Sequence, residues 1–353
     1  MKTVEETTKD LIRFKTVEGN AQELGNCLNY IEGQLDSGLD FQRFEKNDEK
    51  SVLISRGENP RILLHGHLDV IGAEDEIFEP EVENGRIYGR GAADMKSGVA
   101  CMMKVLEGLE DEDVALLLTS DEERGGFNGT GYVIDEADLE PEFVVSGEPD
   151  DSGSFPSIVT RQKGVLQLEI STEGKSAHSS KPEKGENAAE KLLEKYQEIR
   201  ENFDHEKNFS TTINLGKISS EGPVNKIPNK ASVQLDIRFS NQYPRDQVLE
   251  DIEGIEGIDT EILKEAPMME ADEDNVFVQG LRSSAEEVSG QAGFRRENFA
   301  SDMRFFTERG IPAVCFGPEG YDLHGENEYV EIESMEQYCK ILQTFLEEVS
   351  DGF

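Results

Sequence analysis

Short apolar runs and amphipathic segments alternate along the first third of the chain. The runs predict strands, and segments with apolar residues near a helical spacing predict helices. The predicted strands are about Ser51–Ser55, Arg61–His65, Val114–Thr119 and Phe143–Ser146, and the predicted helices are about Thr3–Phe14, Ala21–Leu35 and Met95–Leu109. Strands that alternate with helices favour a mixed, mostly parallel sheet flanked by helices, which is an α/β fold.

The middle of the chain has a different order of elements, β-α-β-β-α-β, which is the split βαβ or ferredoxin-like arrangement. The predicted elements are about Gly164–Thr172, Asn187–Asn202, Thr211–Ile218, Ala231–Phe239, Arg245–Ile255 and Thr260–Leu263. From about Asp274 the chain again shows the α/β pattern of its first third, with a strand at Ala313–Phe316 and a helix at Glu333–Val349. We therefore predict an α/β domain from residues 1–163 and 274–353, with an α+β domain, residues 164–273, inserted into it.

Length and composition agree with two folded domains. A chain of 353 residues exceeds one ordinary core, and 36% hydrophobic residues with 33 glycines is typical of a globular α/β protein. The sequence has no apolar run long enough to span a membrane and no apolar signal core after Met1, so we expect a cytoplasmic protein. The four cysteines form no CxxC pair, which is typical of a reducing compartment.

The charge is strongly negative. Asp and Glu number 75 against 35 Lys and Arg, a formal net charge of −40. Nucleic acid and anionic membranes are therefore excluded as expected partners, because both require a basic surface. The acidic residues are spread along the chain, which favours a highly saline cytosol where salt screens self-repulsion. An ordinary acidic enzyme is the alternative.

Histidine and carboxylate side chains recur where predicted strands end or helices begin. His67 and Asp69 follow an apolar strand, and Asp94 follows a glycine-rich turn, where it is either a ligand or a helix cap. Glu122 and Glu123 belong to an acidic triplet after another strand, which alone would indicate only a solvated surface. The remaining members of the set are Glu148, after a third strand, and His324, in a C-terminal loop. Such ligands suit Zn²⁺ or similar divalent ions in open, catalytic sites.

Five motifs in this order resemble the M20 family of metallohydrolases, and specifically its acetylornithine deacetylase and succinyl-diaminopimelate desuccinylase branch. The motifs are HGHLDV (65–70), YGRGAADMKSG (88–98), TSDEERGG (119–126), VSGEP (145–149) and LHGENEYV (323–330). The resemblance implies two divalent metal ions, usually Zn²⁺ and sometimes Co²⁺ or Mn²⁺, in the α/β domain. His67 and Glu148 would bind the first ion, Glu123 and His324 would bind the second, and Asp94 would bridge both.

The resemblance also implies catalytic roles. Glu122 would act as the general base, taking a proton from the attacking water and giving it to the leaving amine. Asp69 would hold the ring of His67. The inserted domain would be a lid and dimerisation domain, and its His178 would reach the partner subunit's active site and stabilise the oxyanion of a homodimer. Asn225 and Arg238 resemble lid residues that bind the substrate carboxylate, although Arg238 also fits an ion pair at a strand end.

The substrate is left open at this level. Desuccinylases usually have an arginine and a serine where this chain has Gln162 and Val165, which weakens desuccinylation, and a Gly-Thr-rich carboxylate loop of many relatives reads FASDMR (299–304) here. We expect an N-acyl amino acid deacylase of the acetylornithine deacetylase type. A dipeptidase or carboxypeptidase, or a desuccinylase, is the alternative within the family. Glu122 argues against a non-catalytic metal-binding relative, and Gly89–Gly98 lacks the spacing of a phosphate loop, which argues against a phosphoesterase.

Overall fold

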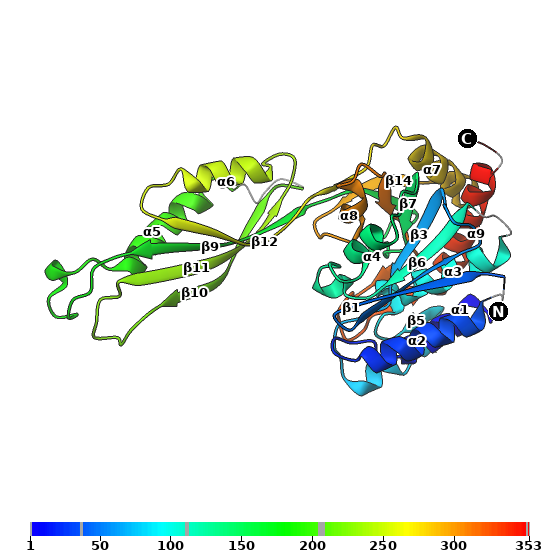
Figure 1. Cartoon of the computed structure of the whole chain (residues 1–353), viewed down its shortest axis with the longest axis horizontal. Helices are drawn as coiled ribbons and strands as arrows, with labels where there is room; N and C mark the ends of the chain where they lie inside the picture. The colour runs from blue at the N-terminus through cyan, green and yellow to red at the C-terminus, as the bar shows by residue number, and fades with distance from the viewer. Residues whose placement is uncertain (1, 36–37, 110–112, 204–208, 351, 353) are drawn as a thin grey trace. The chain divides into compact units, whose positions relative to one another are not determined.

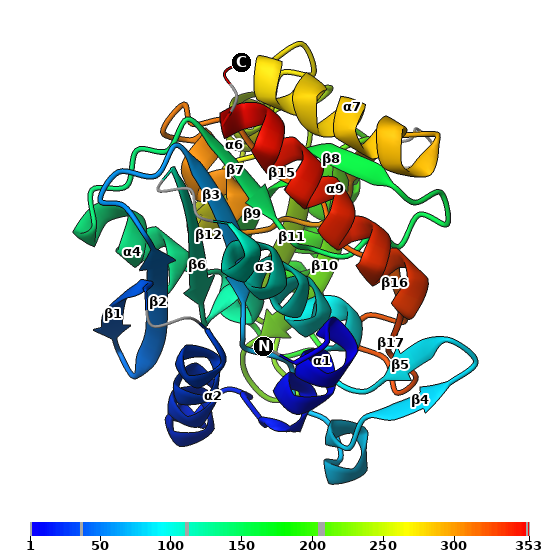
Figure 2. The same cartoon turned by 90° about the vertical axis from the view of Figure 1, so that its right-hand side faces the viewer.

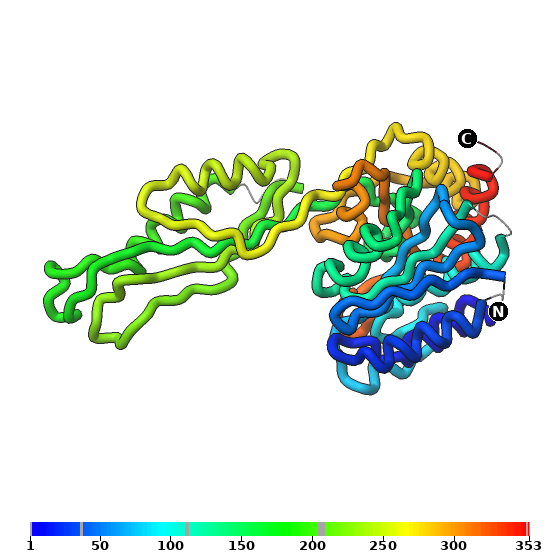
Figure 3. The backbone as a smooth tube through the Cα atoms, viewed as in Figure 1, coloured from blue at the N-terminus to red at the C-terminus, as the bar shows by residue number. Residues whose placement is uncertain are grey.

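The computed structural model describes residues 2–35, 38–109, 113–203, 209–350 and 352. The chain forms two compact units. The first unit consists of Met1–Arg161, Glu270–Arg295 and Ser301–Phe353, and the second consists of Gln162–Met269 and Arg296–Ala300. The inserted domain was predicted at 164–273, and the tube in Figure 3 follows the middle of the chain through the second unit. The short segment 296–300 belongs to the second unit, whereas the predicted division places it in the first.

The first unit is built on a large mixed sheet in the strand order β1-β2-β6-β3-β7-β15-β8-β13, with β14 paired to β8. Its central strand β3 is parallel to β6 and β7, and β7 is parallel to β15. The strands are β1 (Asp40–Lys46), β2 (Glu49–Ser55), β3 (Ile62–His67), β6 (Val114–Thr119), β7 (Phe143–Ser146), β8 (Ser157–Gln162), β13 (Met269–Glu270), β14 (Gly293–Glu297) and β15 (Ala313–Cys315). The central strands are buried along their whole length, as parallel strands covered on both faces must be.

Helices cover both faces of this sheet, which confirms the predicted α/β fold (Figures 1 and 2). Helices α1, α3, α7 and α9 pack together on one face, and α8 contacts β7 and β15. The helices are α1 (Val4–Arg13), α2 (Ala21–Gln34), α3 (Ser97–Gly108), α4 (Thr130–Glu136), α7 (Val276–Ser289), α8 (Met303–Thr307) and α9 (Ile332–Ser350). Among the described residues, none of the helices is long and apolar enough to cross a membrane.

The sequence pattern missed several strands, most of them short or polar, although the missed strand β8 is six residues long and largely buried. Strand β1 carries charged residues on an edge, so its alternation is weak. A small separate sheet in the order β16-β17-β5-β4 has strands too short to show any periodicity. These strands are β4 (Glu81–Glu83), β5 (Arg86–Tyr88), β16 (Gly320–Tyr321) and β17 (Tyr329–Glu331).

The second unit is a four-stranded antiparallel sheet in the order β10-β11-β9-β12, with two helices. The elements follow the predicted β-α-β-β-α-β order: β9 (Gly164–Glu173), α5 (Ala188–Arg200), β10 (Thr212–Ser220), β11 (Lys230–Phe239), α6 (Arg245–Glu253) and β12 (Asp259–Ala266). Alternate residues of β9 and β11 join residues of α5 and α6 in a core of their own, as half-buried strands require. The other face of β9 and β11 carries the polar side chains Gln167, Glu169, Gln234, Asp236 and Arg238.

Candidate metal centre

The carboxyl ends of β3, β6 and β7 lie side by side and carry most of the predicted ligands. His67 ends β3, Glu122 and Glu123 follow β6, and Glu148 follows β7. Ligands of open α/β sheets bind at this edge. Asp94 reaches the same place from the turn before α3, where its φ and ψ of −113° and 94° are not helical. The start of α3 comes close to the Glu148 segment because Gly98 has no side chain: a Cβ there would lie 2.3 Å from the carbonyl oxygen of Gly147.

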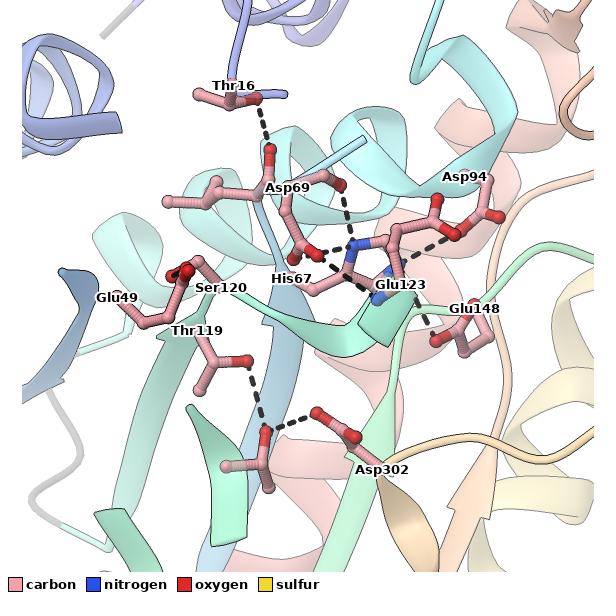
Figure 4. Close-up of polar contacts among 12 residues, drawn as sticks. Thr16, Glu49, His67, Asp69, Asp94, Thr119, Ser120, Glu123, Glu148 and Asp302 are labelled. Carbon is pink, nitrogen blue, oxygen red and sulfur yellow. Dashed lines mark hydrogen bonds and ion pairs between the residues drawn. The ribbon is translucent and has the colours of Figure 1, made fainter. Parts of the chain in front are cut away.

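The first group of donor atoms comes from His67, Asp94 and Glu148. The Nε2 atom of His67 lies 3.0 Å from Oδ1 of Asp94 and 3.8 Å from Oε1 of Glu148. The histidine is fully buried and the two carboxylates are nearly so. Figure 4 shows Asp94 and Glu148 pointing toward the same side of the His67 ring.

The second group consists of Asp94, Glu123 and His324. The Nε2 atom of His324 lies 3.2 Å from Oδ2 of Asp94 and 3.2 Å from Oε2 of Glu123. Within each group one donor atom per residue lies within 4.8 Å of the others. The two oxygens of Asp94 thus face different histidines, which is the position of a carboxylate shared by two sites.

Asp69 contacts His67 through its main chain. The backbone carbonyl oxygen of Asp69 is 2.9 Å from Nδ1 of His67, while its Oδ1 atom is 3.5 Å from Nδ1. The other carboxylate oxygen accepts a hydrogen bond of 3.1 Å from the backbone N–H of Glu123. A carbonyl acceptor at Nδ1 selects the tautomer whose Nε2 lone pair faces Asp94 and Glu148. The Asp69 carboxylate lies beside the same ring nitrogen and also holds the backbone of Glu123.

Crowding of buried carboxyl groups raises several pKa values. Burial, with the charges of Asp302 and Glu148, raises the pKa of Glu122 well above its usual range. Burial and the charge of Asp94 raise the pKa of Glu148 to about 8. Hydrogen bonds to Asp94 and Glu123 raise the pKa of His324 to about 10. So much negative charge in one buried place requires protons or cations to compensate it.

These residues fit divalent metal ions. Nitrogen and carboxylate oxygen donors with no thiolate are the ligands that Zn²⁺ accepts in catalytic sites, and Co²⁺ and Mn²⁺ accept them too. The two groups would hold two ions that share Asp94, because each group supplies three donors and Asp94 belongs to both. Glu122 lies next to Glu123 in the chain but belongs to neither group.

A buried ion pair that the sequence analysis did not single out connects the two loops that carry Asp94 and His324. Glu328 is 1% exposed and accepts hydrogen bonds of 3.0 Å from the backbone N–H groups of Ala93 and Asp94. Its other oxygen is 2.5 Å from Nη1 of Arg90. The Nη2 atom of Arg90 donates to the carbonyl oxygens of His324, at 3.0 Å, and Gly325, at 3.1 Å. Arg90 and Glu328 both belong to the family motifs quoted above, and this membership was the sequence feature that could have identified them.

A second buried network lies behind the centre. The carboxyl group of Asp302 is 1% exposed and accepts a hydrogen bond of 2.6 Å from the hydroxyl of Thr130. The same hydroxyl lies 2.9 Å from Nε2 of His65, whose pKa burial lowers to about 3, so that this ring is neutral. Asp302 stands in the FASDMR segment that replaces the glycine-rich loop of relatives, and only the fold brings its charge near Glu122.

The predicted residues of the inserted domain lie within the second unit. His178 is exposed, and its Nδ1 atom accepts from the backbone N–H of Ser180. The segments of His178 and Asn225 are paired, because the N–H of Ser179 donates to the carbonyl oxygen of Asn225 at 3.0 Å. Arg238 forms an ion pair of 2.7 Å with Asp236.

Asn225 and Arg238 lie toward different ends of strand β11. Asn225 precedes the first residue of β11, Lys230, and Arg238 is the ninth residue of that strand. Eight residues of extended strand span about 26 Å. The length of β11 therefore separates Arg238 from the end of the second unit that carries Asn225, a separation that residue types alone do not reveal.

Comparison with known families agrees with this geometry. Residues 63–348 match the model of peptidase family M20/M25/M40. The chain belongs to this family. M20 enzymes are metal-dependent hydrolases of peptide and amide bonds, so the chain is an M20-type hydrolase.

Relatives of this M20 chain span it almost completely. It is 26% identical to a succinyl-diaminopimelate desuccinylase of Thioalkalivibrio sulfidiphilus over 94% of the chain and 95% of that protein. A tripeptidase structure from Staphylococcus aureus superposes with a TM-score of 0.80 at 20% identity, covering 99% of this chain and 98% of the other. An M20 metallo-carboxypeptidase from Sulfolobus solfataricus gives 0.76 at 20% identity, covering 98% and 99%. The structural matches confirm the fold.

Proposed function

We propose that this M20 enzyme removes the acyl group from an N-acyl amino acid, in the manner of acetylornithine deacetylase. The observation that supports it is the sharing of Asp94 between two ligand groups, with the buried carboxyl group of Glu122 beside them. His67, Asp94 and Glu148 would hold one ion, and Asp94, Glu123 and His324 the other. When bound, such ions polarise the amide carbonyl and make water more acidic.

The chain's own residues would then move the proton. Glu122 takes a proton from the attacking water as the new C–O bond forms, and delivers it to the nitrogen as the C–N bond breaks. The products are a carboxylic acid and a free amine. Burial and the neighbouring charges of Asp302 and Glu148 raise the pKa of Glu122, which suits a group that must accept and return a proton near neutral pH.

The positions of His178, Asn225 and Arg238 support an active site shared between two subunits. His178 and Asn225 occupy one end of the second unit, and Arg238 lies near the other end of β11. If all three act on one substrate, His178 and Asn225 of one subunit must complete the site that holds Arg238 of its partner. A homodimer through the second unit provides this arrangement, with His178 donating to the developing oxyanion.

The acyl amino acid is favoured over a succinylated diacid by two residues. Gln162 and Val165 stand where desuccinylases usually have an arginine and a serine, so the cation that would pair with the succinyl carboxylate is missing at position 162. Arg238 remains to pair with the α-carboxylate of the amino acid.

An amine-release screen of the zinc-loaded protein in high salt tests the proposal. The panel contains N-acetylornithine, other N-acyl amino acids, N-succinyl-diaminopimelate and a set of dipeptides. We expect N-acyl amino acids to give the highest kcat/KM. A preference for dipeptides would agree with an M20 hydrolase but would contradict the proposed deacylase function.

Metal dependence is measured on the same protein. Exhaustive chelation should abolish activity, and Zn²⁺ or Co²⁺ should restore it. Full activity after chelation, verified by metal analysis, would contradict the two-ion centre.

A further inference from the structure

The turn that carries Glu122 and Glu123 has an unusual backbone conformation. Asp121 lies in the left-handed region at φ 83°, which residues other than glycine rarely adopt, and Gly125 and Gly126 lie in it at φ 107° and 67°. The N–H of Gly125 donates to the carbonyl oxygen of Glu122 at 2.7 Å. The N–H of Gly126 donates to that of Asp121, also at 2.7 Å. So short and strained a turn keeps two functional carboxyl groups in place only when the surrounding structure supports it.

The side chain of Arg304, in α8, reaches this turn. Its Nη2 atom donates to the carbonyl oxygen of Gly125 at 2.5 Å, and its Nη1 atom donates to the carbonyl oxygen of Ser301 at 2.6 Å. Arg304 is 4% exposed, so water competes little for these hydrogen bonds. One planar guanidinium therefore joins the end of the turn to the segment that precedes α8.

Asp302 packs against the next residue of the same turn. A Cβ at Gly126 would lie 2.0 Å from Oδ1 of Asp302, so only glycine fits there. This oxygen lies 3.8 Å from Nη2 of Arg304, and the other oxygen accepts the hydrogen bond from Thr130. Arg304 and Asp302 therefore contact two consecutive residues of the turn, Gly125 and Gly126.

These contacts concern the FASDMR segment (299–304), which stands where many relatives have a Gly-Thr-rich carboxylate loop. The side chains of Asp302 and Arg304 are buried, and their hydrogen bonds go to protein groups. Neither side chain is therefore free to bind a substrate carboxylate, which favours a supporting role for this part of the segment.

We propose that Arg304 is a positioning residue for the turn of Glu122 and Glu123, with Asp302 packed beside it. By holding the carbonyl group of Gly125, it fixes one carboxyl group for proton transfer and the other for the second metal ion. The first of these roles rests on the proposed function, and the second rests on the ligand group of Asp94, Glu123 and His324. Because misplacement by about 1 Å can cost about 100-fold in rate, a looser turn should slow the reaction.

Hydrogen exchange and metal competition test this role without turnover, on the zinc-loaded full chain. In Arg304→Met we expect the amides of residues 121–126 to exchange about tenfold or more faster, and affinity for the second ion to fall about 10- to 100-fold. The rest of the first unit should exchange as in the wild type. Arg309→Met is the matched control, because the hydrogen bonds of Arg309 go to Phe305 and Asp135.

Steady-state kinetics on the best substrate of the screen give a further readout. Arg304→Met should lower kcat about 10- to 100-fold and change KM less than about twofold, because the turn positions reacting groups and Arg304 does not touch the substrate. Arg304→Lys keeps one donor and should lose less. If Arg304→Met does not fold, Gly126→Ala replaces it, since the added methyl group collides with Asp302. Its control is Gly290→Ala, because Gly290 has a similar φ of 80° and open space around its Cβ.

Two results would overturn the inference. One is exchange of the turn that stays as in the wild type or rises only together with the whole first unit. The other is faster exchange of the turn that leaves both kcat and the affinity for the second ion unchanged. If no compound of the panel is hydrolysed, the proposed function fails, and hydrogen exchange with metal affinity still decides the role of Arg304.

Discussion

At the scale of single residues, the centre combines ligands that contact each other directly with buried groups that position them. Asp94 faces both histidines, and its orientation depends on the loop that Glu328 holds through two backbone N–H groups. Arg90 holds the His324 loop through two carbonyl oxygens. The Arg90–Glu328 pair therefore connects two ligands of the second group without touching the donor atoms.

Glu328→Gln tests this connection. The change leaves the buried charge of Arg90 without its anion, and we expect a loss of about 3–5 kcal/mol in the free energy of unfolding. We also expect affinity for the second metal ion to fall about 10- to 100-fold, because outer partners orient ligands. Competition with a chromophoric chelator measures the affinity, and thermal unfolding measures the stability.

Glu331→Gln is the control for this variant. Glu331 pairs with Arg86 at 2.7 Å near the surface, where solvent screening leaves an ion pair little effect on stability. Unchanged metal affinity in Glu328→Gln, with the control also unchanged, would show that the pair does not position the ligands.

At the scale of elements, parallel strands and one long antiparallel strand place the functional residues. The ends of β3, β6 and β7 bring His67, Glu123 and Glu148 to one edge of the sheet, because neighbouring parallel strands end side by side. Strand β11 does the opposite, since its ten residues separate the Asn225 end of the second unit from Arg238. The first arrangement favours a site within one unit, and the second favours a site completed by another subunit.

Mixing two inactive variants tests the shared site. Glu122→Gln should retain metal and lose turnover, and His178→Ala should also be inactive. If His178 acts in the partner's site, random exchange of subunits should restore about a quarter of wild-type activity, because about half of the dimers are mixed and each has one complete site. The control mixes Glu122→Gln with the double variant that carries both Glu122→Gln and His178→Ala. No subunit of this mixture has Glu122, so no complete site can form. No recovery in verified mixed dimers would contradict the shared site.

At the scale of the whole molecule, the large negative net charge is the main feature that affects stability. A formal net charge of −40 gives strong self-repulsion, which salt reduces by shortening the Debye length from about 10 Å at 0.1 M to about 3 Å at 1 M. Most charged pairs lie at the surface, where each contributes little. We propose that the protein works in a saline cytosol.

The corresponding prediction concerns stability against salt. The midpoint of thermal unfolding should rise markedly between 0.1 and 2 M KCl. Sucrose at matched osmolality is the control, because it acts by exclusion from the surface and does not screen charge. A midpoint that KCl leaves unchanged would mean that the acidic residues are tolerated without salt.

The α/β class, the β-α-β-β-α-β order of the second unit and the residues whose types suit a metal centre could be read from the amino-acid sequence alone. Burial periodicity and strand ends are local properties, so they are readable without coordinates. The packed fold was needed to show that Asp94 faces both histidines, that the carbonyl oxygen of Asp69 contacts His67, and that β11 separates Arg238 from the Asn225 end of the second unit. It also brought Arg304 to the turn that carries Glu122 and Glu123. Such contacts join residues distant in sequence, and the packing of whole elements decides them.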